Sequence, residues 1–418
     1  MQRSFTFVFL LIVCFVLSVG ALAAQDAPTP EPVGLRPDAP QYALHGPYWV
    51  GTADFTTDVG RNAPLVIHAW YPALNPDGAA EEIDYLASIK EYDRAADLPS
   101  TLRIAGHALP NAAVDFSAAP YPLIVFSAGF GNTPYAYAGM LEHWASQGFV
   151  ILAPEHQERF DWALTDQAKG LAHRPQDIRA VLDYAESRTT ETGAAQGLMD
   201  MDHVAVAGHS GGGYTTLAMG GAQIDLAGMR RRCEAAASAG DPNAAICDMT
   251  LPVMGEVAGL VGLDSAPDGL WPSFGDPRVD AIIPMAGDSY LFDQAGLAEI
   301  TIPVMAIGGT TDNGTPFDWG ARPAFEYASS AQKVLVGIEN ADHLIFGLKI
   351  DEAPAILDTM LGPYYLDPVW DKDRAHDLIN HFTTAFLLST LKGDADAAAA
   401  LSPNAVAFPG IEYRAEGF

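Results

Sequence analysis

The chain has 418 residues, 49% of them hydrophobic and 18% charged, which is enough to bury a large core in one to three domains. Its 52 acidic and 22 basic side chains give a formal net charge of −30, and this balance argues against nucleic acid as a partner. The sequence shows no internal repeat, no zinc-ligand spacing and no basic patch, so no metal is expected.

The first 24 residues have the pattern of a secretory signal. Arg3 is the only charge among them, residues 5–19 are apolar, and the small residues "ALA" end the segment, with cleavage expected after Ala23 or Ala24. The sequence therefore predicts a secreted or periplasmic protein with no stable membrane partner once the signal is removed. An N-terminal membrane anchor is the alternative, because the apolar segment is just long enough to span a bilayer.

Residues 25–40 are rich in proline and acidic side chains, a composition typical of a flexible leader, and residues 41–418 would form the catalytic domain. Removal of the signal leaves only Cys233 and Cys247. Two cysteines in an exported protein most simply form one disulfide, and a pair of buried free thiols is the alternative.

Apolar strand-like runs alternate with helical patterns along the remaining chain. This alternation predicts an α/β fold with a mostly parallel central sheet and helices on both faces. The first two strands, 48–55 and 64–72, are expected to form an antiparallel pair. Later strands are expected at 122–130, 149–155, 203–208, 279–287, 302–309 and 333–339. Helices are expected after the cap residue Thr133, at 174–187, and at 373–391 before the stop residue Gly393.

Residues 221–277 interrupt this alternation. The segment contains both cysteines and ends in a stretch rich in proline and glycine. Because an excursion of this length is seldom an unstructured loop, we expect a helical, lid-like insertion in the catalytic domain.

The stretch "VAVAGHSGGGYTTLAMGG" at 204–221 surrounds Ser210 with glycines. An apolar β-type run precedes the serine and a helical run follows it, so the G-x-S-x-G pattern lies on a sharp strand-to-helix turn, the nucleophile elbow. Gly208 and Gly212 remove side chains that would collide where the turn folds back on itself. The hydroxyl of Ser210 should then stand above the carboxyl edge of the sheet, in front of a helix N-terminus.

A serine nucleophile needs a histidine base and a carboxylate that orients the base, and in this type of fold both follow the serine along the chain. Asp312 and His343 each come just past the end of a predicted strand. We therefore expect Ser210 to be the nucleophile, His343 the general base and then acid, and Asp312 the orienting carboxylate. Asp288, one strand earlier, is the alternative carboxylate.

An oxyanion hole needs two N–H donors. Gly211 directly follows the serine and is expected to supply one; Phe130, between two glycines in "SAGFGN", is expected to supply the other. Among the aromatic residues, Tyr214 and Trp319 are candidates for substrate binding in an acyl pocket, and a place in the hydrophobic core is the alternative for both.

Six motifs follow one another in the order expected of a known group of enzymes: "FSAGFGN", "PEHQ", "HRPQDIRAVLD", "GHSGGG", "GGTTDNGTP" and "NADHLIFG". Over residues 45–392 the chain resembles the bacterial α/β-hydrolases called dienelactone hydrolase-like or platelet-activating-factor acetylhydrolase-like. The resemblance implies the α/β-hydrolase fold and a serine carboxylester hydrolase without a metal or organic cofactor. It assigns the triad to Ser210, Asp312 and His343 and an oxyanion residue to Phe130. Because dienelactone hydrolases themselves use a cysteine nucleophile, it does not imply that activity.

These observations predict an exported serine esterase that acts through an acyl-enzyme on small-molecule esters of short or medium acyl chains. An extracellular lipase or a cutinase-like polyester hydrolase, with residues 221–277 gating a site for a polymeric ester, is the main alternative. An amidase or peptidase with the same triad and a non-catalytic binding protein on the same scaffold are two further alternatives.

Overall fold

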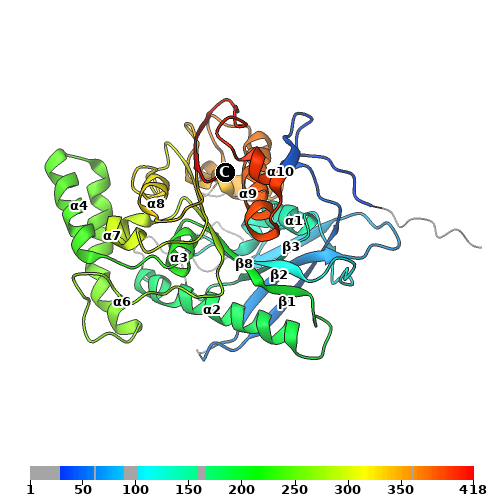
Figure 1. The fold of residues 1–418 in the computed structure, drawn as a ribbon, viewed down its shortest axis with the longest axis horizontal. Coiled ribbons are helices and arrows are strands. Elements are labelled where there is room, and N and C mark those ends of the chain that lie inside the picture. Colours follow the sequence, from blue (N-terminus) through cyan, green and yellow to red (C-terminus); the bar gives the residue numbers. More distant parts are fainter. Residues whose placement is uncertain (1–28, 61–62, 89–100, 159–164, 359–361) are drawn as a thin grey trace, which may run out of the picture.

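The computed structural model of the protein describes residues 29–60, 63–88, 101–158, 165–358 and 362–418 (Figure 1). Within these residues, the centre of the molecule is a ten-stranded sheet in the order β12-β11-β10-β9-β8-β6-β7-β2-β1-β5. Helices cover both of its faces, so the predicted α/β architecture is confirmed.

The central strands of the sheet run parallel. They are β6 (Tyr121–Ser127), β7 (Val150–Pro154), β8 (Met199–His209), β9 (Ala281–Met285), β10 (Val304–Gly309) and β11 (Lys333–Ile338). Every residue of β6, β7, β9, β10 and β11 is buried, which explains why these strands are continuous apolar runs in the sequence. Because the strands are parallel, the loops that follow them all emerge at one edge of the sheet.

Antiparallel strands complete the sheet on both sides. As predicted, β1 (Trp49–Thr57) and β2 (Leu65–Ala73) pair with each other, with Trp49 opposite Ala73, and β2 also pairs with β7. At the opposite edge, β12 (Ile411–Glu416) pairs with β11. The sequence analysis did not predict β12, the short β5 (Leu109–Pro110), or the separate hairpin of β3 (Ile83–Ser88) and β4 (Thr101–Gly106).

Two hydrophobic cores, one on each face of the sheet, hold the helices in place. α1 (Ala138–Ser146) and α9 (Lys372–Lys392) pack on one face through side chains such as Trp144 and Phe386. α2 (Gln167–Thr190), α3 (Gly211–Met219) and α8 (Ala321–Tyr327) pack on the other (Figure 1). The predicted helix boundaries hold at two sites: Thr133 caps the 3₁₀ turn η2 (Pro134–Tyr137) that precedes α1, and Gly393 ends α9 in the left-handed conformation. The smaller helices are α7 (Asp293–Leu297) and α10 (Ala395–Ala400).

The segment 221–277 is helical, with α4 (Leu226–Ala239), α5 (Ala245–Thr250) and α6 (Met254–Leu260). The predicted disulfide is present: Cys233 of α4 is bonded to Cys247 of α5, and the two Cα atoms are 6.0 Å apart. In Figure 1 these helices form the left end of the molecule, where α6 packs on α2 and α4 packs on α7.

The predicted signal peptide and the first part of the predicted leader lie outside the described residues. In the part of the chain that the structure does describe, no helix is both long and apolar enough to cross a bilayer. The same residues contain no group of three or more His, Cys, Asp or Glu side chains that could hold a metal ion.

Removal of the disulfide should lower stability and leave the chemistry of the site intact. The bond joins residues 14 apart in sequence, and a cross-link that closes a loop of this size contributes about 3 kcal/mol to the free energy of unfolding. We expect the double variant Cys233→Ser/Cys247→Ser to unfold at a lower urea concentration, and a reducing agent to produce the same shift in the unmodified protein. The kcat/KM of the folded variant for a soluble ester should be unchanged; a large fall would show that the insertion reaches the site.

Candidate active site

A cavity of about 460 Å³ opens at the carboxyl edge of the parallel strands, where ligands usually bind in open α/β sheets. Its walls come from the loops that follow β6, β8, β10 and β11, and from residues just beyond position 361. The lining residues are Gly129, Phe130, Asn132, Tyr137, His209, Ser210, Asn313, Gly314, Asp342, His343, Leu344, Tyr364 and Tyr365.

None of these lining residues comes from the segment 221–277. The helices of this segment pack beside α2 and α7, at one end of the molecule, and a role as a lid stays a prediction. The pattern of the sequence indicates helices there correctly, but it does not indicate which side of the sheet they cover.

Ser210 occupies the turn between β8 and α3. Its φ of 56° and ψ of −121° are a strained combination for a residue with a side chain. Two backbone hydrogen bonds hold the turn: the N–H of Ser210 donates to Met285 O (2.9 Å), and the N–H of Tyr214 donates to Ser210 O (3.0 Å). The structure thus contains the sharp strand-to-helix turn that the motif predicts, and Ser210 faces the cavity.

The glycines around the serine permit close backbone contacts. A Cβ atom on Gly208 would lie 2.5 Å from Gly212 O, and one on Gly212 would lie 1.9 Å from Ser127 O. A Cβ atom on Gly213 would lie 2.5 Å from the Cα of Gly287. Because the opposing atoms belong to the backbone, any side chain at these positions would displace the turn, as predicted for Gly208 and Gly212.

His343 begins the 3₁₀ turn η6 (His343–Phe346), after β11, and its side chain is 20% exposed toward the cavity. Its Nδ1 lies 2.8 Å from Oδ2 of Asp312, which follows β10 and is almost fully buried. The other carboxylate oxygen of Asp312 accepts hydrogen bonds from the N–H groups of Gly314 and Thr315, both at 2.7 Å. The carboxylate is therefore fixed, and it leaves Nε2 of the imidazole available for chemistry.

Burial lowers the pKa of His343, but the charge and the hydrogen bond of Asp312 outweigh burial, so the net effect is a pKa above the ordinary value of a histidine. The charge of Asp288 adds to this effect. Asp288, the alternative carboxylate, is itself buried, which raises its pKa, and it accepts a hydrogen bond from Thr315 Oγ1 (2.9 Å). The imidazole is thus bonded to Asp312, and Asp288 acts on it only through its charge.

His209 supports the histidine loop in a way that the sequence analysis did not predict. Its Nε2 lies 2.9 Å from the carbonyl oxygen of His343, and its Nδ1 lies 2.8 Å from the hydroxyl of Tyr137. Burial lowers the pKa of His209 far below its ordinary value, and the positive charge that His343 can carry lowers it further. The ring of His209 is therefore neutral. A carbonyl oxygen can only accept a hydrogen bond, so Nε2 of His209 donates to the backbone oxygen of His343. Its Nδ1 then accepts a hydrogen bond from the hydroxyl of Tyr137.

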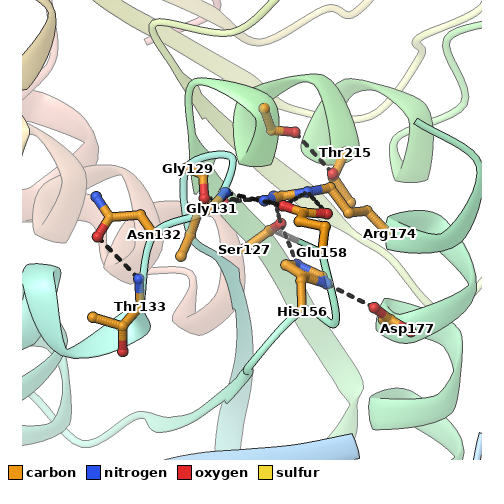
Figure 2. A network of polar contacts seen from close by, with 12 residues as sticks. Ser127, Gly129, Gly131, Asn132, Thr133, His156, Glu158, Arg174, Asp177 and Thr215 are labelled. Atoms are coloured by element: carbon orange, nitrogen blue, oxygen red, sulfur yellow. Dashed lines mark hydrogen bonds and ion pairs between the residues drawn. The ribbon is translucent and has the colours of Figure 1, made fainter. Parts of the chain in front are cut away.

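The two residues expected to form an oxyanion hole are neighbours in space. A Cβ atom on Gly211 would lie 3.4 Å from the backbone nitrogen of Phe130. Gly211 is also the first residue of α3, so its N–H belongs to the positive end of a helix dipole. Phe130 lies in the loop 128–131 after β6, and Figure 2 shows this loop beside the first turn of α3.

The structure does not bring the two predicted aromatic substrate-binding residues into the cavity, and that expectation is corrected. Tyr214 is completely buried on the inner side of α3, where its ring stacks on Phe292 and its hydroxyl donates to Leu171 O (3.0 Å). Trp319 is buried under the guanidinium of Arg232, 5.2 Å from the ring centre. The aromatic residues that do line the cavity are Phe130, Tyr137, Tyr364 and Tyr365.

Comparison with known proteins agrees with this architecture. Residues 105–231 match the family model named chlorophyllase; this segment extends from the end of β4 past Ser210 into α4. Among solved structures, a ferulic acid esterase from Streptomyces cinnamoneus superposes with a TM-score of 0.52 at 20% sequence identity, and the match covers 87% of this chain and 95% of that one.

The fold is that of an α/β-hydrolase. The enzyme class that the comparisons indicate is a carboxylic ester hydrolase. Neither match names the dienelactone hydrolase-like or platelet-activating-factor acetylhydrolase-like enzymes, so membership of that particular family stays a prediction.

The raised pKa of His343 predicts the pH dependence of activity. A general base must be neutral, so kcat/KM should fall as the pH drops through the pKa of His343, with a midpoint above the ordinary value of about 6.5. The variant Asp312→Asn should lose roughly 10⁴-fold in kcat, and the midpoint of its residual activity should move to lower pH. A pH profile of kcat/KM measures both effects.

Asp288→Asn is the graded control for this profile. It removes a charge that raises the pKa of His343 less than Asp312 does, so it should shift the midpoint in the same direction by a smaller amount. An Asp312→Asn profile with an unshifted midpoint would contradict the assignment of the acid limb to His343.

Proposed function

We propose that this protein is an exported serine carboxylester hydrolase that acts on esters of short or medium acyl chains through an acyl-enzyme. One observation carries the proposal: Ser210, on a strained turn, and His343, bonded to the buried carboxylate of Asp312, line the same cavity. This arrangement supports the roles of nucleophile, general base and orienting carboxylate, in that order.

In the proposed reaction, Ser210 Oγ attacks the ester carbonyl carbon while Nε2 of His343 takes the hydroxyl proton. The carbonyl electron pair moves onto its oxygen, and the N–H groups of Gly211 and Phe130 stabilise the negative charge. The intermediate collapses, its carbon–oxygen bond to the alcohol breaks, and His343 gives the proton to the leaving alcohol. Water then attacks the acyl-enzyme by the same steps, which releases the acid and restores Ser210.

The size and lining of the cavity support a substrate of moderate size. A volume of about 460 Å³ falls at the lower end of the range for small-molecule sites, and four aromatic side chains offer apolar contact to an acyl group. The name of the structural neighbour, an esterase, supports the same reaction class. The N-terminal sequence pattern and the disulfide support export, because disulfides persist in oxidising compartments.

A second candidate, an extracellular lipase or cutinase-like polyester hydrolase, is favoured by exposed apolar side chains in the segment that contains Tyr364. Tyr364 lines the cavity and is 57% exposed, and Leu366 and Val369, close to it in sequence, are 54% and 62% exposed. Exposed apolar side chains in a segment that borders a site suit contact with a polymer or an emulsion. The same triad geometry would also serve an amidase or a peptidase. A binding protein without catalysis would not need this geometry.

Hydrolysis of p-nitrophenyl esters from acetate to palmitate tests the proposal. We expect kcat/KM to be highest for short or medium chains, and Ser210→Ala to lower kcat by several orders of magnitude because the nucleophile is lost. Circular dichroism should show that Ser210→Ala folds normally. Full activity of Ser210→Ala would overturn the proposal, and a strong preference for emulsified or solid polymer over soluble esters would move it to the second candidate.

A further inference from the structure

A cluster of buried polar side chains lies beside the cavity and has no part in the reaction described above (Figure 2). Its members, none more than 4% exposed, are Ser127, His156, Glu158, Arg174 and Asp177. Ser127 ends β6, His156 and Glu158 follow β7, and Arg174 and Asp177 lie one turn apart on α2. The cluster thus joins two sheet strands and a helix directly behind the loop 128–131.

Three members repeat the connectivity of a catalytic triad. Ser127 Oγ lies 2.9 Å from His156 Nε2, and His156 Nδ1 lies 2.8 Å from Asp177 Oδ2. All three side chains are buried and none lines the active-site cavity, so a substrate has no access to this hydroxyl. Ser127 Oγ also accepts a hydrogen bond from Arg174 Nη1 at 3.3 Å. These contacts describe a structural network, in contrast to Ser210.

Arg174 connects this network to the backbone of the loop. Its Nη1 donates to Ala128 O (2.5 Å) and its Nη2 donates to Gly129 O (3.0 Å). Its Nε donates to both carboxylate oxygens of Glu158, at 2.9 and 3.0 Å, and its Nη2 is also bonded to that carboxylate. Glu158 in turn accepts a hydrogen bond from Gly131 N (3.2 Å). The Arg174–Glu158 ion pair therefore holds backbone groups on both sides of Phe130.

The planarity of the peptide bond connects these contacts to the oxyanion hole. In a trans peptide the C=O and N–H groups point in opposite directions. The carbonyl of Gly129 and the N–H of Phe130 belong to one peptide, so Arg174, by binding Gly129 O, directs the N–H of Phe130 away from the guanidinium. The neighbouring peptide obeys the same geometry: Arg174 binds Ala128 O, and on the opposite side the N–H of Gly129 donates to the hydroxyl of Tyr137 (3.3 Å). Phe130 itself lies in the cavity wall, and the centre of its ring is 6.0 Å from the guanidinium carbon of Arg174.

Burial of this ion pair is costly for stability. Removing an arginine and a glutamate from water carries a desolvation penalty that their attraction does not always repay, and apolar residues of similar volume can stabilise a core equally well. The guanidinium, however, has five N–H donors in a rigid plane, and here it binds two carbonyl oxygens, a hydroxyl and a carboxylate at once. An apolar core would remove the donors to both carbonyl oxygens and leave Gly129 O with the N–H of Asn132 (3.0 Å).

We propose that Arg174 and Glu158 are positioning residues of the oxyanion hole: they orient the N–H of Phe130 toward the reacting carbonyl. The chain Ser127–His156–Asp177 fixes the guanidinium from behind. This inference rests on the proposed function, because it requires an oxyanion to stabilise. Arg174 touches neither the substrate nor the triad; it acts through the backbone of the loop 128–131.

The test compares Arg174→Lys with the matched control Arg278→Lys. A lysine at 174 keeps the charge but loses the planar fork that binds both carbonyl oxygens. Arg278 makes a similar two-pronged contact with Asp276, and neither residue lines the cavity, so its variant reports the general cost of this substitution. The measurements are kcat and KM for p-nitrophenyl butyrate, and the inhibition constant of a trifluoromethyl ketone, whose adduct with serine mimics the oxyanion.

We expect Arg174→Lys to lower kcat roughly 10- to 100-fold with KM changed less than twofold, because misplacing a catalytic group by about 1 Å has an effect of this size. The affinity for the trifluoromethyl ketone should fall in proportion to kcat, and the control should change neither quantity. A purely structural role would lower the melting temperature while kcat per folded molecule stays constant, and that result would overturn the inference.

Ser127→Ala gives an answer even if Arg174→Lys does not fold. It keeps the ion pair and removes one hydrogen bond from the guanidinium, so kcat and ketone affinity should fall together by about three- to tenfold. Unchanged values would contradict the inference. Inactive wild-type protein, or full activity of Ser210→Ala, would instead refute the proposed function; activity that Ser210→Ala abolishes and Arg174→Lys preserves would refute only the positioning role.

Discussion

The active site depends on one close backbone contact, between the turn after β8 and the end of β6. The two strands are neighbours in the sheet, with Ser127 opposite Gly208, and a Cβ atom on Gly212 would fall 1.9 Å from Ser127 O. Only glycine allows the first turn of α3 to approach so closely. The contact places the turn of Ser210 directly beside the loop 128–131, so any change that separates them alters the proposed nucleophile and the proposed oxyanion hole together.

The buried backbone oxygen atoms near this contact also need hydrogen-bond donors from the protein. The end of β6 and the loop after it present several oxygen atoms that are buried away from water, and buried acceptors without partners are costly. Arg174 supplies donors from the side of α2. On the opposite side, the hydroxyl of Tyr137 accepts a hydrogen bond from the N–H of Gly129 and is also bonded to His209. His209 in turn is bonded to the carbonyl oxygen of His343. One hydrogen-bonded path therefore extends from α2 through the loop 128–131 to the loop that holds His343.

The sequence predicts those parts of this arrangement that local patterns specify. The elbow at Ser210 is predictable because glycine spacing and the change from strand to helix occur within a few residues. The pairing of Asp312 with His343 is predictable because parallel strands bring their carboxyl ends to one edge. Periodicity does not say which side of a helix faces a cavity, so the sequence leaves Tyr214 open between an acyl pocket and the core, and the structure places it in the core. Nor does it reveal contacts such as Arg174 with Ala128, which are 46 residues apart.

The residues expected to carry out catalysis and those expected to select the substrate differ in how tightly the structure constrains them. Ser210 and the loop 128–131 are constrained by backbone contacts and buried bonds, so few substitutions there are compatible with the geometry. The outer wall is different: it consists of Asn313, Leu344 and the side chains of η8 (Gly362–Tyr365), which follow β10 and β11 along the chain. Because Asn313, Leu344 and Tyr364 contact the cavity through exposed or half-buried side chains, they can vary without displacing the serine. Selection among esters is therefore expected to depend on the residues after β10 that line the cavity.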